Sequence, residues 1–235
     1  MSVLKLGYWN IRGLAQASRF MLEYTGVAYN DVLYVQAGPN APVPFDKSEW
    51  FDVKNTLGFE FPNLPYLIDG DLKLTQSQAV MRHIARKCPE KNMFGSNDLE
   101  MCAIDTLLGE YSDKKGKMTN LQYSDGVTGA GESFIIGEGS EDMKAHLTKF
   151  SNFLGDKEWF VGGRVTVADC CMYEYLFQCF CYAERAQVSN YRIQFPLLND
   201  FCRRFEGLSS IKAYMASERY AMATSGFNNQ HAKFR

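Results

Sequence analysis

The run Asn63–Lys87, NLPYLIDGDLKLTQSQAVMRHIARK, constrains the fold more than any other part of this 235-residue chain. Two short apolar segments flank Asp69-Gly70, and a D-G pair between such segments is a strong signal of a two-residue β-hairpin turn. A helical pattern follows the second segment. The run therefore predicts a strand, a turn at Asp69-Gly70, a second strand and a helix.

The start of this helix carries polar groups that suit an anion. Gln76 and Ser77 supply an amide and a hydroxyl where the first backbone N–H groups of a helix lack intrahelical partners. Simple capping of the helix would use the same two residues. Pro65 opens the first strand of the pair, where its missing N–H need not be paired and a cis peptide bond can be accommodated. These features predict a site for a peptide-like, negatively charged small molecule.

The residues before this run predict a strand, a helix and another strand. Val3–Trp9 alternates in the manner of a strand, and Ala28–Gln36 is the second strand. Between them, Leu14–Gly26 has an amphipathic helical pattern that ends at a glycine. A loop rich in Pro, Gly and Asn follows over 37–55. With the hairpin and its helix, this order predicts a thioredoxin-like βαβ-ββα unit whose first two strands are parallel.

Strand signals nearly vanish beyond the polar segment 87–98, and long helical patterns replace them. Thr166 and Asp169 have the spacing of a capping box, and the apolar stretch after them predicts a buried central helix. The Gly-rich stretch 124–142 predicts a loop. The other stretches that predict helices are 99–123, 143–156 and 196–217.

These patterns predict the fold class and the domain bounds. We expect an α/β thioredoxin-like N-terminal domain (βαβ-ββα) over 1–88, which would bind the small molecule. A linker over 89–94 then leads to an all-α helical C-terminal domain over 95–235.

Composition and charge exclude several classes of protein. A net charge of −2 offers no basic patch for a nucleic acid. The chain opens with no secretory leader and has no apolar stretch near the roughly 20 residues that span a bilayer, so we expect a cytoplasmic protein without a membrane partner. The seven cysteines include no C-x-x-C, and the three histidines lack zinc spacing. Reduced thiols in a helical core, with no metal site, are therefore expected.

Two groups of residues could carry chemistry. Tyr8 ends the first strand, and ligands of open α/β sheets bind beyond the carboxyl ends of parallel strands. Its hydroxyl could donate a hydrogen bond to an anion, although an ordinary core tyrosine fits the same position. Lys47, Trp50 and Lys54 cluster in the loop after the second strand. Two cations and an indole N–H could hold a carboxylate there, or could simply form a solvated face.

Familiar catalytic motifs are missing from the sequence. It contains no phosphate-binding loop, no dinucleotide-binding glycine motif, no G-x-S-x-G and no H-E-x-x-H. The protein is therefore predicted to supply binding and electrostatics while its ligand brings the reactive group.

Over most of its length the chain resembles the cytosolic glutathione transferases, and the mu class in particular. Segment 6–26 resembles the first strand and helix of that class, and segment 45–87 resembles its loop, dimer-lock and glutathione-site region nearly residue for residue. Segments 158–170 and 195–220 resemble the helical domain. The Tyr8-Trp9 pair and the D-x-S-x-W loop are the features most specific to the mu class.

The resemblance implies an enzyme that conjugates the thiolate of reduced glutathione to hydrophobic electrophiles, as in detoxification. Glutathione would be a co-substrate, with no tightly bound cofactor, and Tyr8 would be the catalytic hydroxyl that stabilises the thiolate. The residues implied in glutathione binding are Tyr8, Trp9, Leu14, Lys47, Trp50, Lys54, Asn63, Leu64, Pro65, Gln76, Ser77 and Asp113. The residues implied at the electrophile pocket are Trp9, Leu14, Tyr123 and Phe227.

The resemblance also implies a homodimer. Phe61 would enter a pocket of the other subunit, and Asp113 would reach into the other subunit's glutathione site. Asp113 and Tyr123 are placed by an ungapped count from Gly95 and have no signal of their own. Phe227 matches the family only with a one-residue shift. The chain departs from the family in its longer loop after the second strand, which carries three prolines, and in the longer Gly-rich stretch 124–142.

The sequence leaves two other functional classes open. One is a glutathione-dependent isomerase of the prostaglandin type, against which the D-x-S-x-W loop favours the mu class. The other is a non-catalytic protein of the same fold that binds hydrophobic ligands or serves a structural role. Tyr8 and the complete set of glutathione-site residues argue against that second class.

Overall fold

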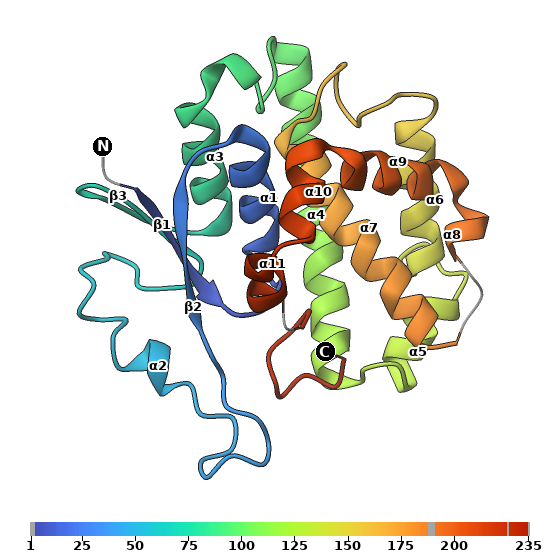
Figure 1. Ribbon diagram of the computed structural model, residues 1–235. Coiled ribbons are helices and arrows are strands. Elements are labelled where there is room, and N and C mark those ends of the chain that lie inside the picture. The colour runs from blue at the N-terminus through green and yellow to red at the C-terminus, as the bar shows by residue number, and fades with distance from the viewer. Residues whose placement is uncertain (1–2, 188–190, 225, 235) are drawn as a thin grey trace. The chain divides into compact units, whose positions relative to one another are not determined.

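The computed structural model describes residues 3–187, 191–224 and 226–234. The chain divides into two compact units (Figure 1). The described residues of 1–91 and 210–231 form the first unit, and those of 92–209 and 232–234 form the second. The domain bounds of 1–88 and 95–235 remain a prediction, and their outermost residues lie outside the described part of the chain.

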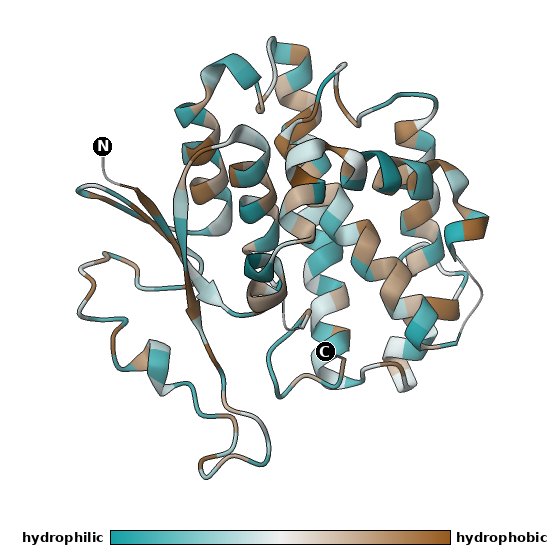
Figure 2. Ribbon diagram, in the orientation of Figure 1, coloured by the Kyte–Doolittle hydropathy of each residue, from teal (hydrophilic) through white to brown (hydrophobic). Residues whose placement is uncertain are grey.

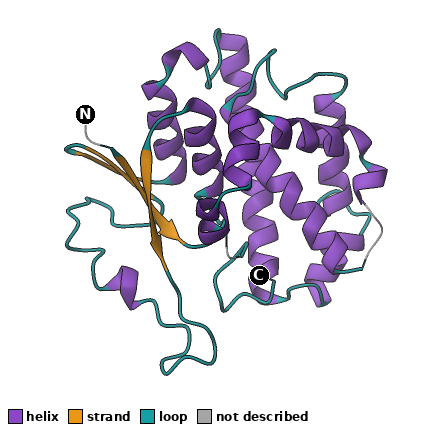
Figure 3. Ribbon diagram, in the orientation of Figure 1, coloured by secondary structure: helices purple, strands orange, loops and turns teal. Residues whose placement is uncertain are grey.

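The first unit is built on a four-stranded sheet with the order β2-β1-β3-β4, drawn in orange in Figure 3. Its strands are β1 (Leu4–Trp9), β2 (Tyr29–Tyr34), β3 (Tyr66–Asp69) and β4 (Leu72–Thr75). β1 pairs with β2 in parallel and with β3 antiparallel, and β3 pairs antiparallel with β4. The βαβ-ββα order and the parallel first pair are therefore confirmed.

The hairpin turn lies one residue later than predicted. Asp69 pairs with Leu72, so the two loop residues are Gly70 and Asp71. Gly70 has a φ of 61°, the positive value that a type II′ turn requires at its first central position. The D-G pair therefore marks the hairpin correctly, but the aspartate is the last strand residue because only the glycine adopts that backbone conformation without strain.

Helices complete the first unit. α1 (Gln16–Thr25) packs beside α3 (Ser77–Lys87), and it ends at Gly26, whose φ is 74°. Phe20 of α1 is fully buried. The remaining helices of this unit are α2 (Ser48–Phe51), α10 (Ser209–Met215) and α11 (Glu218–Ala223), and a 3-10 turn spans Pro89–Lys91.

The prediction of an uninterrupted loop over 37–55 was wrong at α2. The Asp46 carboxylate accepts hydrogen bonds from the backbone N–H of Ser48 at 3.0 Å and from its hydroxyl at 2.7 Å. These bonds to Ser48 lower the pKa of Asp46. The carbonyl of Lys47 then accepts from the N–H groups of Trp50 and Phe51, which closes a short helical turn.

The described part of the second unit contains helices and no strands. They are α4 (Asp98–Ser124), α5 (Gly129–Ile136), α6 (Met143–Leu154), α7 (Val167–Arg185), α8 (Tyr191–Gln194) and α9 (Pro196–Gly207). α5 contradicts the predicted loop over 124–142. It forms because Phe134 and Ile135 are buried and because Gly131 allows the backbone at Gly126 to approach closely. Hydrophobic periodicity in the sequence reveals neither of these two packing effects.

α7 is the buried central helix that the sequence predicts, and Figure 2 shows brown and tan tones along most of its length. Its capping box is present. The Thr166 N–H and hydroxyl donate to Asp169 at 2.7 and 2.8 Å, and the Phe160 N–H donates to the same carboxylate at 2.8 Å. All seven cysteines are free thiols, as expected, and five of them are buried: Cys88, Cys170, Cys171, Cys179 and Cys202. Burial raises the pKa of Cys170, Cys171 and Cys202, so these thiols are poor nucleophiles.

His146 of α6 is a buried titratable group that makes stability depend on pH. Its side chain is fully buried, its Nδ1 lies 3.1 Å from the Tyr175 hydroxyl, and its Nε2 lies 3.7 Å from the Glu141 carboxylate. Burial, with Lys114 nearby, outweighs the opposing effect of Glu141 and lowers the pKa of His146 from 6.5 to about 4. The folded protein therefore holds a neutral imidazole at pH values where the unfolded chain already binds a proton.

We expect this difference to destabilise the protein in acid. The contribution of His146 should be complete above pH 6.5 and should be lost as the pH falls from 6.5 towards 4, by up to about 3 kcal/mol. Urea unfolding midpoints of the wild type and of His146→Gln, which cannot titrate, would be compared between pH 7 and pH 4.5. Parallel pH profiles of the two proteins would contradict this assignment.

Candidate active site

Tyr8 lies near the carboxyl end of β1, and its side chain is 7 % exposed. Its hydroxyl oxygen accepts a hydrogen bond from the backbone N–H of Leu14 at 3.0 Å. A hydroxyl that accepts such a bond becomes a better donor, because hydrogen bonds in a chain polarise one another. This geometry suits a hydroxyl that must donate to an anion beyond the end of the strand.

Gly13 makes that hydrogen bond possible, although sequence reasoning did not single it out. Its φ is +43°, and a Cβ on this residue would lie 2.4 Å from the Tyr8 hydroxyl oxygen. The loop can pass over the tyrosine ring only because this position has no side chain. A glycine between a predicted strand and a predicted helix was the available signal in the sequence.

Trp50 is held in an aromatic cluster under the same end of the sheet. It is 3 % exposed, stacks on Tyr66 at 6.0 Å between ring centroids, and meets Tyr34 edge-on at 5.3 Å. The Tyr34 and Tyr66 hydroxyls lie 3.0 Å apart, and burial raises the pKa of Tyr66. The ring contacts of the two tyrosines therefore hold the indole in place.

Lys47 and Lys54 flank Trp50 on two successive turns of the chain. The backbone N–H of Trp50 donates to the carbonyl of Lys47 at 3.1 Å, and the backbone N–H of Lys54 donates to the carbonyl of Trp50 at 2.9 Å. The Lys54 ammonium lies 5.2 Å from the centre of the Phe51 ring. The structure thus brings the three residues of the predicted carboxylate site together on a single short segment.

The peptide bond between Leu64 and Pro65 is cis, as the sequence allows, and both residues are buried. The exposed Asn63 side chain accepts a hydrogen bond from the Leu64 N–H at 2.9 Å. Any ligand that pairs with that N–H must therefore displace the Asn63 amide.

Gln76 precedes α3 in an unusual conformation, with φ of 71° and ψ of 116°. Its side chain makes no capping hydrogen bond to the helix, so the simple capping interpretation does not hold for Gln76. Its carbonyl accepts the N–H of Val80 at 3.0 Å. A positive φ in a non-glycine residue costs free energy and is frequently retained where the side chain has a functional role.

The remaining predicted residues are less closely tied to this cluster. Trp9 is nearly buried, and Leu14 is 45 % exposed beside Tyr8. The Phe227 carbonyl accepts a hydrogen bond from the Gly13 N–H at 3.1 Å, so the C-terminal segment touches the loop after Tyr8. Asp113 and Tyr123 lie on α4 of the second unit, where Asp113 is exposed and Tyr123 is half-buried.

Comparison with known proteins supplies the decisive observation. The family described as "Glutathione S-transferase, N-terminal domain" matches residues 4–86, and "Glutathione S-transferase, C-terminal domain" matches residues 138–218. Glutathione S-transferase 2 of Gallus gallus is 42 % identical over 94 % of this chain and 93 % of its own length. The chain belongs to the glutathione S-transferase family. Glutathione S-transferase Mu 2 of Homo sapiens is 39 % identical over 92 % of each chain, so the mu-class resemblance is confirmed.

Solved structures of other glutathione S-transferases share this fold. The pi-class enzyme of Onchocerca volvulus has a TM-score of 0.79 and 26 % identity, covering 98 % of this chain and 100 % of its own. The transferase Blo t 8 has a TM-score of 0.82 and 27 % identity, covering 98 % and 99 %. The predicted fold class is therefore confirmed.

This glutathione S-transferase is an enzyme of a family that uses glutathione as co-substrate. Within the described residues, no cluster of three or more His, Cys, Asp or Glu side chains could hold a metal ion. None of the described helices combines the length and the hydrophobicity that crossing a membrane demands.

Proposed function

We propose that this transferase binds glutathione against the ends of β1 and α3 and that Tyr8 stabilises the thiolate of the bound tripeptide. Trp50, Lys47 and Lys54 hold the glycine carboxylate, with Lys47 acting as a point charge. Asn63, Leu64 and Pro65 meet the peptide backbone, and Gln76 and Ser77 hold the γ-glutamyl end. The electrophile is hydrophobic, and the residues proposed to line its pocket are Trp9, Leu14, Tyr123 and Phe227.

The hydrogen bond from the Leu14 N–H to the Tyr8 hydroxyl carries this proposal. A free thiol has a pKa of about 8.5, so little thiolate exists at neutral pH. A polarised hydroxyl donor favours the charged form of the sulfur and lowers the thiol pKa. The thiol proton is released to solvent. The thiolate then attacks the electrophilic carbon and forms a carbon–sulfur bond, and the group that it displaces departs with its electron pair.

One pair of measurements tests the proposal. The protein should be retained on immobilised glutathione and should conjugate glutathione to a chlorodinitrobenzene-type acceptor. Retention without conjugation would favour a non-catalytic binding protein of the same fold. A protein that is neither retained on immobilised glutathione nor active in conjugation would contradict the proposed glutathione site.

We propose further that the active protein is a homodimer. Phe61 is 74 % exposed in the single chain, and burying such an aromatic ring recovers roughly 1.5–3 kcal/mol. Under two-fold symmetry the contact is made twice, with Phe61 of each subunit entering the other. Asp113 then lies near the γ-glutamyl ammonium bound by the partner subunit, and each site needs both chains.

Phe61→Glu should shift the protein towards monomer in sedimentation experiments, because an unpaired carboxylate is costly to bury. The monomer should also turn over poorly despite an intact Tyr8, since its site lacks the second-subunit acid. Ile193→Glu is a matched control, because Ile193 is also 74 % exposed but lies on α8. A wild-type protein that is fully active as a monomer would refute the idea.

A further inference from the structure

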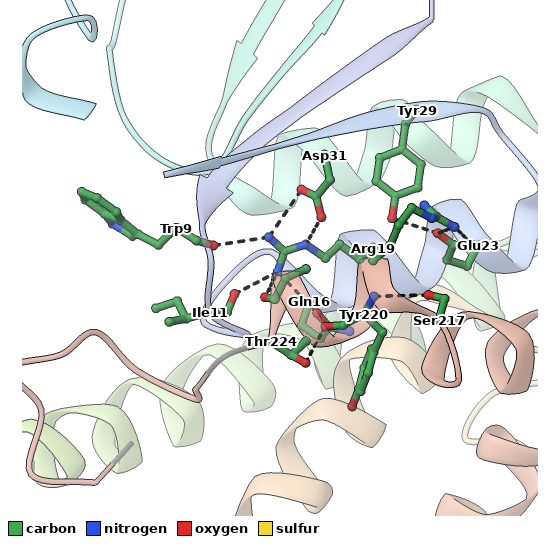
Figure 4. A network of polar contacts seen from close by, with 12 residues as sticks. Trp9, Ile11, Gln16, Arg19, Glu23, Tyr29, Asp31, Ser217, Tyr220 and Thr224 are labelled. Carbon is green, nitrogen blue, oxygen red and sulfur yellow. Dashed lines mark hydrogen bonds and ion pairs between the residues drawn. The ribbon is translucent and has the colours of Figure 1, made fainter. Parts of the chain in front are cut away.

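Arg19 of α1 places its guanidinium group at the centre of the polar network in Figure 4, although its side chain is fully buried. Its Nε donates to the Asp31 carboxylate of β2 at 2.7 Å, and its Nη2 lies 3.4 Å from the second oxygen of that carboxylate. A buried ion pair of this kind adds little net stability, because desolvation offsets most of the attraction. The ion pair between Arg19 and Asp31 therefore acts mainly by fixing the orientation of the guanidinium group.

The remaining donors of Arg19 point at the loop that follows Tyr8. Nη1 donates to the carbonyl of Ile11 at 2.8 Å, and Nη2 donates to the carbonyl of Trp9 at 3.4 Å. A guanidinium presents its donors in a rigid planar fork, so it fixes the directions of these two carbonyls together. Three residues after Ile11, the same loop offers the Leu14 N–H to the Tyr8 hydroxyl.

Described residues near the C-terminus also contact this loop or Arg19. Arg19 Nη1 donates to the carbonyl of Ala223, at the end of α11, at 3.2 Å. The Arg12 and Gly13 N–H groups donate to the carbonyls of Gly226 and Phe227 at 2.9 and 3.1 Å. The Arg12 guanidinium donates to the Tyr220 hydroxyl and lies between 5.6 and 5.8 Å from the ring centres of Tyr220 and Phe227.

We propose that Arg19 is a positioning residue for the thiolate chemistry. Together with the carbonyls of Gly226 and Phe227, it holds the loop after Tyr8 so that the Leu14 N–H remains directed at the Tyr8 hydroxyl. This inference rests on the proposed role of Tyr8. It adds that the acidity of the bound thiol depends on a residue that touches neither substrate.

Arg19→Lys tests the inference. A lysine keeps a positive charge for Asp31 but cannot hold the loop carbonyls with a planar fork. We expect turnover to fall about threefold to tenfold, the rate equivalent of weakening one hydrogen bond. The thiol pKa of glutathione in the binary complex should rise by about half to one unit, and the Michaelis constant for glutathione should change little.

Arg192→Lys provides the matched control. Arg192 belongs to α8 of the second unit, donates to Glu184 at 2.7 Å and has its guanidinium 4.7 Å from the centre of the Phe180 ring. Its turnover and thiol pKa should equal those of the wild type. Asp31→Asn serves as a second variant if Arg19→Lys does not fold, because it removes the charge that orients the guanidinium and keeps the side-chain shape. It should shift the thiol pKa in the same direction.

These measurements distinguish a failure of the positioning role of Arg19 from a failure of the proposed role of Tyr8. A folded Arg19→Lys or Asp31→Asn protein with wild-type turnover and thiol pKa would overturn the positioning role, even if its melting temperature fell. In that result Tyr8→Phe would still raise the thiol pKa, and the proposed function would stand. If Tyr8→Phe left the thiol pKa unchanged, the proposed function would fail, and the inference would fail with it.

Discussion

Tyr8→Phe is expected to lower turnover by roughly one to two decades while the fold and the affinity for glutathione remain. The hydroxyl should bind the thiolate more strongly than the thiol, and a hydrogen bond to a charged group contributes about 1.5–3 kcal/mol. The thiol pKa in the binary complex should rise by about one to two units. Spectroscopic titration of the bound thiol and steady-state kinetics over a range of pH would measure both effects.

A second buried tyrosine controls for the loss of a hydroxyl as such. Tyr173 of α7 donates to Glu206 at 2.8 Å, and its ring is fully buried. Tyr173→Phe should therefore cost some stability but leave turnover and thiol pKa at wild-type values. Equal rates for Tyr8→Phe and the wild type near neutral pH would remove Tyr8 from the mechanism.

Asp169→Ala is expected to give the largest loss of stability, about 3–5 kcal/mol. The carboxylate is fully buried and accepts three hydrogen bonds, two from Thr166 and one from the Phe160 N–H. Its removal leaves those donors unpaired inside the helical unit, and each unpaired buried group costs about 1–3 kcal/mol. Urea unfolding followed by circular dichroism would measure the change.

An exposed helix cap gives the comparison. Asn97 caps α4 by accepting a hydrogen bond from the Glu100 N–H at 3.0 Å in an exposed setting. Asn97→Ala should cost only about 1 kcal/mol, because water can replace the lost partner. Similar losses for Asn97→Ala and Asp169→Ala would show that burial does not amplify the cost of losing this cap.

Local sequence determined the elements that depend on neighbouring residues. The hairpin of β3 and β4, the glycine end of α1 and the capping box of α7 each follow from a few adjacent side chains and their backbone preferences. The helical periods of α4, α6 and α9 likewise agree with the structure. The segments that carry the glutathione-site residues could therefore be identified before any contact between them was known.

For some candidate site residues the arrangement follows from local spacing, and for others it depends on the fold. Lys47, Trp50 and Lys54 lie on two successive turns, so their proximity could be anticipated from spacing alone. The approach of Gly13 to the Tyr8 hydroxyl could not be, because it depends on a positive φ and on how the loop crosses a ring. That the Gln76 side chain does not cap α3 also depends on backbone angles that residue identity does not specify.

Tertiary structure alone decided the features that join distant parts of the chain. α5 forms in a Gly-rich stretch because Phe134 and Ile135 find buried surroundings. Arg19 links the loop after Tyr8 to Ala223, some 200 positions away along the chain. Propensity, periodicity and capping act over a few residues, whereas packing and buried hydrogen bonds are satisfied by whichever groups the fold brings near. The sequence by itself thus determined most of the secondary structure and the family of this protein, and the fold decided where α5 forms and how the loop after Tyr8 is held.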